Sequence, residues 1–116
     1  MSQAGSLGSG SGPTPPIVIH GYKAISFADS PYTVIPTDYY ISADTSGGAI
    51  VVNFPDAPTQ NTSYIIKDRT GNASTNNMTV KSLSGVTTVD LAASYLLAGN
   101  FDSIQILYHS GNYEIF

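Results

Sequence analysis

Short apolar runs separated by polar turns repeat along the chain from Ile17 to its end. The most apolar run, 49–54, ends at Pro55 and has the length of a strand, too short for a typical helix. In 78–81 apolar and polar residues alternate, which predicts that Met78 and Val80 lie on a buried face. The expected strands are 17–19, 22–27, 32–35, 39–42, 49–54, 64–68, 78–81, 86–89, 103–108 and 113–116.

The end of the chain predicts a β-hairpin, in which a turn over 109–112 joins two aromatic-rich strands. Residues 91–97 (LAASYLL) have helix-forming character, but this short segment is equally compatible with a loop followed by a strand. Many short strands at this spacing predict a single all-β domain over 17–116. That domain is expected to be a small antiparallel β-sandwich or a β-prism-like domain, and the pattern does not separate the two.

Residues 1–16 form a separate segment that is rich in Gly, Ser and Pro. Apart from Leu7, residues 5–12 are all Gly or Ser, which is typical of a flexible linker. Three prolines then favour an extended backbone, namely Pro13, Pro15 and Pro16. We therefore expect an extended N-terminal arm, 1–16, ahead of the β domain.

Charged residues make up only 10% of the chain, against about 25% in an ordinary globular domain. Four Lys and Arg against eight Asp and Glu give a net charge of −4, so little is available to neutralise phosphates and no nucleic-acid partner is expected. Sheet edges are usually protected by charged side chains, and four cations are few for an all-β domain. We therefore expect copies of the chain to pack together.

Several other classes of protein are not expected from this composition. The chain has no cysteine, which excludes disulfides, thiol nucleophiles and Cys-based zinc sites. Its apolar runs are shorter than the ~18 residues that a membrane helix needs, so no membrane insertion is expected. The N-terminus lacks a basic region followed by an apolar stretch, so no secretory signal is expected either.

Candidate chemistry is sparse. His20 and His109 are far apart in the sequence, and neither has a carboxylate three or four residues away, so we interpret them as polar loop residues and predict no metal site. The seven aspartates fall mostly in loops or at strand ends, where Asp is a common turn former. No spacing marks a catalytic pair, a calcium loop, a nucleophile elbow or a phosphate-binding loop. We therefore predict no catalytic residue, no cofactor and no enzymatic activity.

Tyrosine is the clearest sign of a binding surface, because the chain has eight tyrosines and no tryptophan. Tyrosine suits sites with one apolar side and one wet side, such as subunit interfaces or faces that stack against sugar rings. The candidate interface or glycan contacts are Tyr32, Tyr39, Tyr95 and Tyr113.

One passage, 64–80, carries a more specific pattern: Ile66-Lys67-Asp68 at a strand end, then Gly71-Asn72-Ala73, then Asn77-Met78-Thr79-Val80. Lys67 and Asp68 are placed to fix the exit from the strand, and Gly71-Asn72 supplies the positive φ that a turn needs. Asn77 is expected to bond to the loop backbone.

This passage resembles a motif of tailed-bacteriophage appendage proteins such as tail fibres, head fibres and capsid decoration proteins. The segments 39–44 and 50–55 resemble its lead-in, and the segments 104–108 and 112–116 resemble its terminal hairpin. The resemblance covers 32–116, about three-quarters of the chain. In such proteins the motif builds the fold, so Lys67, Asp68, Gly71, Asn72 and Asn77 are expected to be structural.

The resemblance implies a non-enzymatic virion structural protein, made in the host cytoplasm and placed on the particle surface, and a homotrimer. Residues 1–16, with Leu7, Pro13, Pro15 and Pro16, would then anchor the subunit to a capsid, collar or tail protein. A receptor-binding module for cell-surface glycan is the alternative function. A carbohydrate-active enzyme is a third and weaker alternative.

Overall fold

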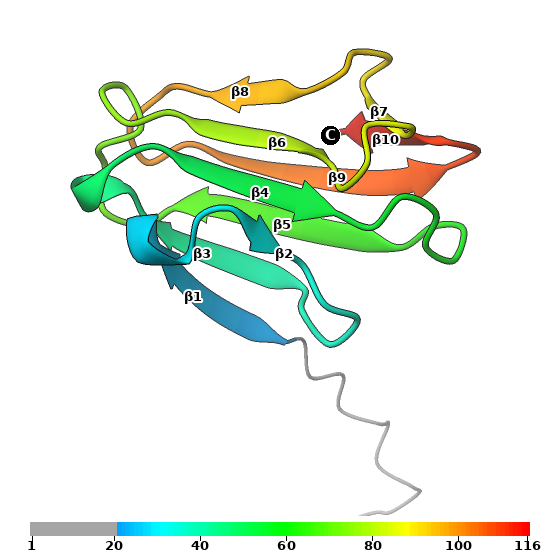
Figure 1. Cartoon of the computed structure of the whole chain (residues 1–116), viewed down its shortest axis with the longest axis horizontal. Coiled ribbons are helices and arrows are strands. Elements are labelled where there is room, and N and C mark those ends of the chain that lie inside the picture. Colours follow the sequence, from blue (N-terminus) through cyan, green and yellow to red (C-terminus); the bar gives the residue numbers. More distant parts are fainter. Residues whose placement is uncertain (1–20) are drawn as a thin grey trace, which may run out of the picture.

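The computed structural model describes residues 21–116, which fold into ten strands and two short 3-10 turns (Figure 1). The expected strand at 17–19, His20 and the proposed arm residues Leu7, Pro13, Pro15 and Pro16 lie outside the described residues. The first sheet has six strands in the order β1 (Tyr22–Ser26), β3 (Tyr40–Asp44), β5 (Ser63–Asp68), β9 (Ser103–His109), β10 (Asn112–Ile115) and β7 (Thr88–Val89). The second has four, in the order β2 (Tyr32–Thr33), β4 (Ile50–Phe54), β6 (Met78–Ser82) and β8 (Tyr95–Leu97).

The chain changes sheet at nearly every step. From β1 to β9 each strand lies in the opposite sheet from the strand before it, and only β9 and β10 follow each other in one sheet. The short turns η1 (Phe27–Asp29) and η2 (Thr45–Gly47) lie at two of these crossings. Because two crossings return the chain to the same sheet in its original direction, β1, β3 and β5 are parallel, and so are β2, β4 and β6.

The expectation of an antiparallel domain is therefore wrong, because five of the eight strand pairs are parallel. Alternation of side chains identifies a strand but not the direction of its partner. The all-β class is confirmed, and within residues 21–116 the two sheets correspond to the sandwich alternative. Figure 1 shows the two layers, with β4 and β6 lying across β5 and β9.

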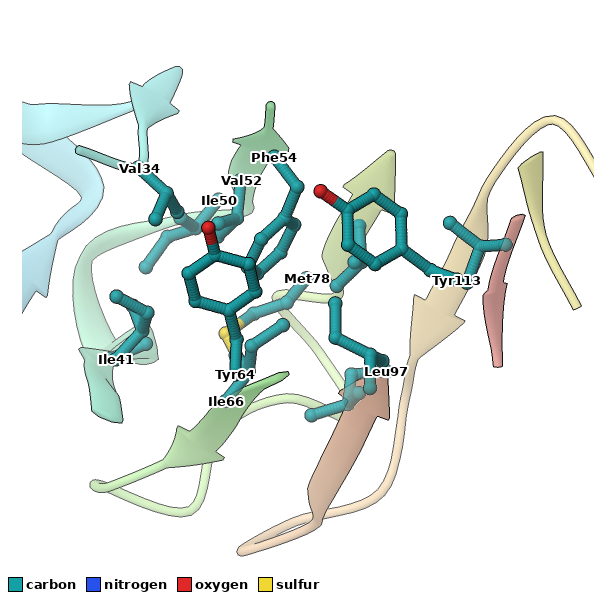
Figure 2. Close-up of a cluster of buried hydrophobic side chains, with 14 of the residues drawn as sticks. Val34, Ile41, Ile50, Val52, Phe54, Tyr64, Ile66, Met78, Leu97 and Tyr113 are labelled. Carbon is teal, nitrogen blue, oxygen red and sulfur yellow. The ribbon is translucent and has the colours of Figure 1, made fainter. Parts of the chain in front are cut away.

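The core lies between the two sheets and is built by the alternation of apolar residues (Figure 2). Ile41 and Ile66 come from the six-stranded sheet, while Val52 and Met78 come from the four-stranded sheet, and all four are fully buried. Burying each side chain of this size contributes about 1.5 to 3 kcal/mol. The expected inward direction of Met78 and Val80 is confirmed.

An aromatic cluster fills one part of this core. Phe54 from β4 lies 4.9 Å from the Tyr64 ring and 5.7 Å from the Tyr113 ring, measured between centroids. Tyr113 also contacts Tyr108, at 5.4 Å in an edge-on arrangement. The Tyr113 hydroxyl donates to the carbonyl of Pro55 at 2.7 Å, so its one polar group is paired although the side chain is fully buried.

Two local expectations have clear outcomes. The turn between β9 and β10 places Ser110 at φ 49° and Gly111 at φ 82°, the left-handed pair that a two-residue hairpin requires, so the predicted hairpin is confirmed. The segment 91–97 is a loop followed by β8, and its helix-forming residues form no helix. Pairing of Tyr95–Leu97 with β6 supplies the contacts that override the local preference.

The substitution Ile66→Ala tests the position of the core. Ile66 is buried between the sheets, so we expect its truncation to lower the free energy of unfolding by about 2 to 5 kcal/mol. Ile35→Ala removes the same atoms from a half-exposed position and is expected to cost less than about 1 kcal/mol. Urea denaturation at one fixed protein concentration measures both, and equal losses would contradict this assignment of the core.

Candidate functional site

The last residue of β5 is Asp68, a buried carboxylate within the passage 64–80 that carries the resemblance. This side chain has no exposed surface and accepts four hydrogen bonds. Its Oδ1 accepts from the Thr45 hydroxyl at 2.7 Å and from the Gly71 N–H at 3.0 Å. Its Oδ2 accepts from the Ala73 N–H at 3.1 Å and from the Phe101 N–H at 2.9 Å. Asp68 thereby joins η2, the turn after β5 and the loop before β9.

These donors determine how Asp68 titrates. Burial is the largest single effect and acts to raise the carboxyl pKa, because it disfavours the charged form. The hydrogen bonds from Thr45, Phe101, Ala73 and Gly71 together outweigh burial and leave the pKa below its ordinary value. Asp68 is therefore a charged group stabilised by fixed N–H and O–H dipoles.

The asparagines of the turn continue the same network. The Asn72 N–H donates to the Thr45 hydroxyl oxygen at 3.1 Å, and the Asn76 side-chain amide donates to the Thr45 carbonyl at 2.7 Å. The Asn77 side-chain amide donates to the Ala73 carbonyl at 2.6 Å. The turn between β5 and β6 is thus held by side chains, which satisfy backbone groups that lie outside the sheets.

Phe101 packs against the two remaining residues of the motif. Gly71 has φ +80°, and a Cβ there would lie 2.3 Å from the Phe101 ring, so only glycine fits. The Lys67 ammonium donates to the Phe101 carbonyl and lies 5.8 Å from the centre of its ring. The structure therefore brings Lys67, Asp68, Gly71, Asn72 and Asn77 together at one end of the sandwich. Lys67 and Asp68 point to opposite faces of the sheet and have different partners.

A shallow groove lies on the outer face of the six-stranded sheet, beside this network. It has a volume of about 330 Å³ and is lined by Tyr22, Tyr40, Ser42, Lys67 and Arg69. Tyr22 and Tyr40 are opposite each other on β1 and β3, and their rings stack with centroids 5.6 Å apart and planes 10° from parallel. The pair gives the groove an aromatic wall, and Lys67 on β5 and Arg69, directly after β5, supply two cations at the other side.

The lining of this groove is cationic. Lys67 and Arg69 are two of the four Lys and Arg residues in the whole sequence. A second hollow of about 320 Å³ has no charged lining and is formed by Pro36, Pro55, Pro58, Thr59, Thr62 and Tyr64. A third is acidic and is formed by Asp90, Leu91, Asn112 and Glu114.

The predicted tyrosine contacts do not form one site. Tyr113 belongs to the core, with no exposed surface and its hydroxyl bonded to Pro55, so it contacts neither a partner nor a glycan. The Tyr113 ring packs between the sheets.

The other three predicted tyrosines lie at separate places. Tyr32 is half-buried and its hydroxyl donates a hydrogen bond to Asp38. Burial, followed by that hydrogen bond, raises the pKa of the Tyr32 hydroxyl. Tyr39 is half-buried, and Tyr95 is exposed on β8.

The groove residues Tyr22, Tyr40, Ser42 and Arg69 were not selected by the sequence pattern. Tyr22 is the first residue of the strand expected at 22–27, and Tyr40 is the second residue of the strand expected at 39–42. Their place near the start of these strands is the signal that the sequence offers. Their stacking depends on the pairing of β1 with β3, which the sequence pattern does not specify.

The remaining candidate residues, the other aspartates and His109, do not form a common site in the described part of the chain. Five aspartates besides Asp68 accept hydrogen bonds from backbone N–H groups nearby or across a loop, and these are Asp29, Asp38, Asp44, Asp56 and Asp90. His109 is exposed at the end of β9. Within residues 21–116 no group of three or more His, Asp or Glu side chains is placed to hold a metal ion.

No protein-family model matches the chain, and no curated protein is similar to it in sequence. In the part of the chain that the structure describes, no helix has the length and apolar character needed to cross a membrane.

Asp68→Asn tests the network at the end of β5. The amide offers one acceptor oxygen and turns the other position into a donor that faces N–H groups. We therefore expect the free energy of unfolding at pH 7 to fall by about 2 to 4 kcal/mol. Glu114→Gln, at an exposed position, is the control and is expected to change it by less than about 0.5 kcal/mol.

The pH dependence of this loss identifies its cause. Because the Asp68 pKa is lowered in the folded chain, the stabilisation is fully present above the unfolded value of about 3.9 and is lost as the pH falls through the folded value. The difference between the native chain and Asp68→Asn should therefore shrink as the pH falls from 5 towards 3. A difference that does not change with pH would show that the charge of Asp68 is not involved.

Proposed function

We propose that this protein is a non-enzymatic structural subunit of a tailed-bacteriophage particle, a short fibre or decoration-type appendage on the virion surface. The observation that carries the proposal is the network around Asp68. The residues that carry the resemblance join the end of β5 to loops in which the chain passes between the two sheets, as expected for a motif that builds a scaffold. The subunit would be made in the host cytoplasm.

The use of the carboxylates supports a structural role. An acid–base mechanism such as glycoside hydrolysis needs two carboxylates placed about 5 to 9.5 Å apart across a substrate. Here Asp68 is buried and accepts four hydrogen bonds. Five other aspartates accept hydrogen bonds from backbone N–H groups, and these bonds stabilise loops.

Self-association into a homotrimer is the assembly that we propose. Several large apolar side chains are exposed over one short stretch around β8, where few charges protect the free edge of the four-stranded sheet. Leu91 is 83% exposed and has φ 64°, an unusual backbone for a leucine. The other members of this apolar stretch are Leu83, Val86, Tyr95 and Leu96.

The solution mass tests the trimer. Three copies of a 12.2 kDa chain weigh about 37 kDa, and we expect light scattering of the full chain to give this mass. Leu91→Ser should lower the mass if the apolar stretch is the subunit contact, whereas Ile35→Ser, at an exposed position on another loop, should not. A monomer at micromolar concentration would contradict the trimer and leave attachment to the particle as a separate question.

Attachment is proposed to occur through residues 1–16, with a capsid, collar or tail protein as the partner. In a phage that encodes this chain, a tagged copy without residues 1–16 should fold with the circular dichroism of the full chain and be missing from purified particles. The full-length tagged copy is the control and should be detected on particles by immunogold labelling. Normal incorporation of the shortened chain would contradict the anchoring role.

Binding of a cell-surface glycan is the second candidate function, and it is compatible with the first. It is supported by the groove on the six-stranded sheet, where two stacked tyrosines stand beside two cations. Tyrosine rings offer an apolar face together with a polar hydroxyl, which suits a ligand that is itself partly apolar.

A further inference from the structure

The groove results from the order of residues on the outer face of β1, β3 and β5. One row across these strands contains Tyr22, Tyr40 and Ile65, and the next contains Ala24, Ser42 and Lys67. The small side chain of Ser42, between Ala24 and Lys67 in its row, leaves a hollow beside the two rings. Tyr22 stacks on the β1 side of the Tyr40 ring, and on the β5 side Ile65 is opposite Tyr40, with Lys67 in the next row.

The floor of the groove has a polar group without a partner. Ser42 is 2% exposed, and its hydroxyl makes no hydrogen bond within the described part of the chain. Among residues 21–116 the unpaired side-chain polar atom that is sealed from solvent is Asn53 Oδ1, so the Ser42 hydroxyl is accessible from the groove. The position of Ser42 in the lining leaves its hydroxyl available to a group that enters the groove.

Two of the four cations of the chain, Lys67 and Arg69, line the groove, whereas Lys23 and Lys81 have contacts elsewhere. Lys23 lies 5.5 Å from the centre of the Tyr32 ring, and the Lys81 ammonium is 3.4 Å from the Ser82 carbonyl, so both are occupied away from the groove. The ammonium of Lys67 is held at the edge of the groove by Phe101. The Arg69 guanidinium is exposed and donates no hydrogen bond among residues 21–116.

One carboxylate, Asp44, lies close enough to be affected by Arg69. The carboxyl pKa of Asp44 is lowered, chiefly by two hydrogen bonds from Ser46, and the charge of Arg69 adds a smaller effect in the same direction. Both hydrogen bonds from Ser46 end on Oδ1 of Asp44, and no hydrogen bond joins Asp44 to Arg69 among residues 21–116. The fork of donors on Arg69 is therefore available for a bidentate partner.

We propose that this groove binds an acidic saccharide, with one sugar ring against Tyr40 and its carboxylate on Arg69 and Lys67. This inference rests on glycan binding as the second candidate function and names the class of ligand. The volume is at the lower end of the range for small-molecule sites, which suits a single ring. The apolar face of the ring packs on Tyr40, a sugar hydroxyl reaches Ser42, and the carboxylate takes the unpaired cation.

Charge favours a singly charged ring over a polyphosphate. The chain has a net charge of −4, so a long polyanion is repelled beyond the groove, whereas one carboxylate meets the local pair of cations. Aromatic rings alone would also accept a neutral sugar, and Arg69 and Lys67 therefore give the preference for acidic sugars.

The test is a titration of the full ¹⁵N-labelled chain with two acidic saccharides that each carry one carboxylate, galacturonate and sialyllactose, followed by amide chemical shifts. Each has a neutral counterpart, galactose and lactose. We expect saturable shifts at 22–24, 40–44 and 65–69 with at least one acidic saccharide, and binding at least tenfold weaker for its counterpart. The tenfold factor corresponds to one charge-assisted hydrogen bond.

Variants assign the binding to the groove. Arg69→Gln should weaken binding about tenfold, and Tyr40→Leu should weaken it while keeping an apolar residue at that position. Lys81→Gln is the matched control, because it removes the same charge from the other sheet, and it should leave the affinity unchanged. An equal loss of affinity in Lys81→Gln would mean that the saccharide responds only to the net charge of the protein, which would overturn the assignment of the groove as the binding site.

Other results would overturn the proposal in distinct ways. It fails if neither acidic saccharide gives saturable shifts, or if the neutral counterparts bind equally well. Equal shifts with inorganic phosphate or with an Asp-rich peptide would reveal a general anion site. A change in mass of Arg69→Gln by light scattering would assign the groove to subunit contact. If saccharide binding fails while the full-length chain still labels phage particles, the ligand proposal falls and the structural function stands.

Discussion

The buried carboxylate of Asp68 is the constraint on which much of this domain depends. A charge without exposed surface is tolerated only if fixed dipoles replace water, and here one hydroxyl and three backbone N–H groups do so. These donors come from three separate stretches of chain, so the position of one side chain fixes the ends of several strands. Loss of any one donor would leave a buried charge less well compensated.

This constraint fits the path of the chain. Since almost every connection crosses between the sheets, the ends of the sandwich contain loops whose backbone groups have no partner strand. Around Asp68 the side chains of Thr45, Asn76 and Asn77 supply the missing partners for backbone groups. The same arrangement places Phe101 against Lys67, and so it positions a cation at the edge of the groove on the outer face.

The elements of the fold could be predicted from local pattern, but their partners could not. Alternation places Met78 and Val80 inward, and Ser110-Gly111 defines a hairpin turn, because both depend on neighbouring residues. The parallel pairing of β1, β3 and β5 joins residues far apart in the sequence, and no local signal marks it. For the same reason Tyr113 appeared to be a surface tyrosine, and Tyr22 was not recognised as the partner of Tyr40.

The distribution of charge connects the scaffold to the groove. Six of the eight acidic side chains accept hydrogen bonds from backbone N–H groups, so most carboxylates of this protein stabilise loops. In a chain with only four cations, that use of carboxylates leaves Arg69 without a hydrogen-bonded acidic partner. An unpaired guanidinium on a sheet face with stacked tyrosines is therefore a consequence of how the loops are stabilised. It is also the feature on which the proposed preference for an anionic ring rests.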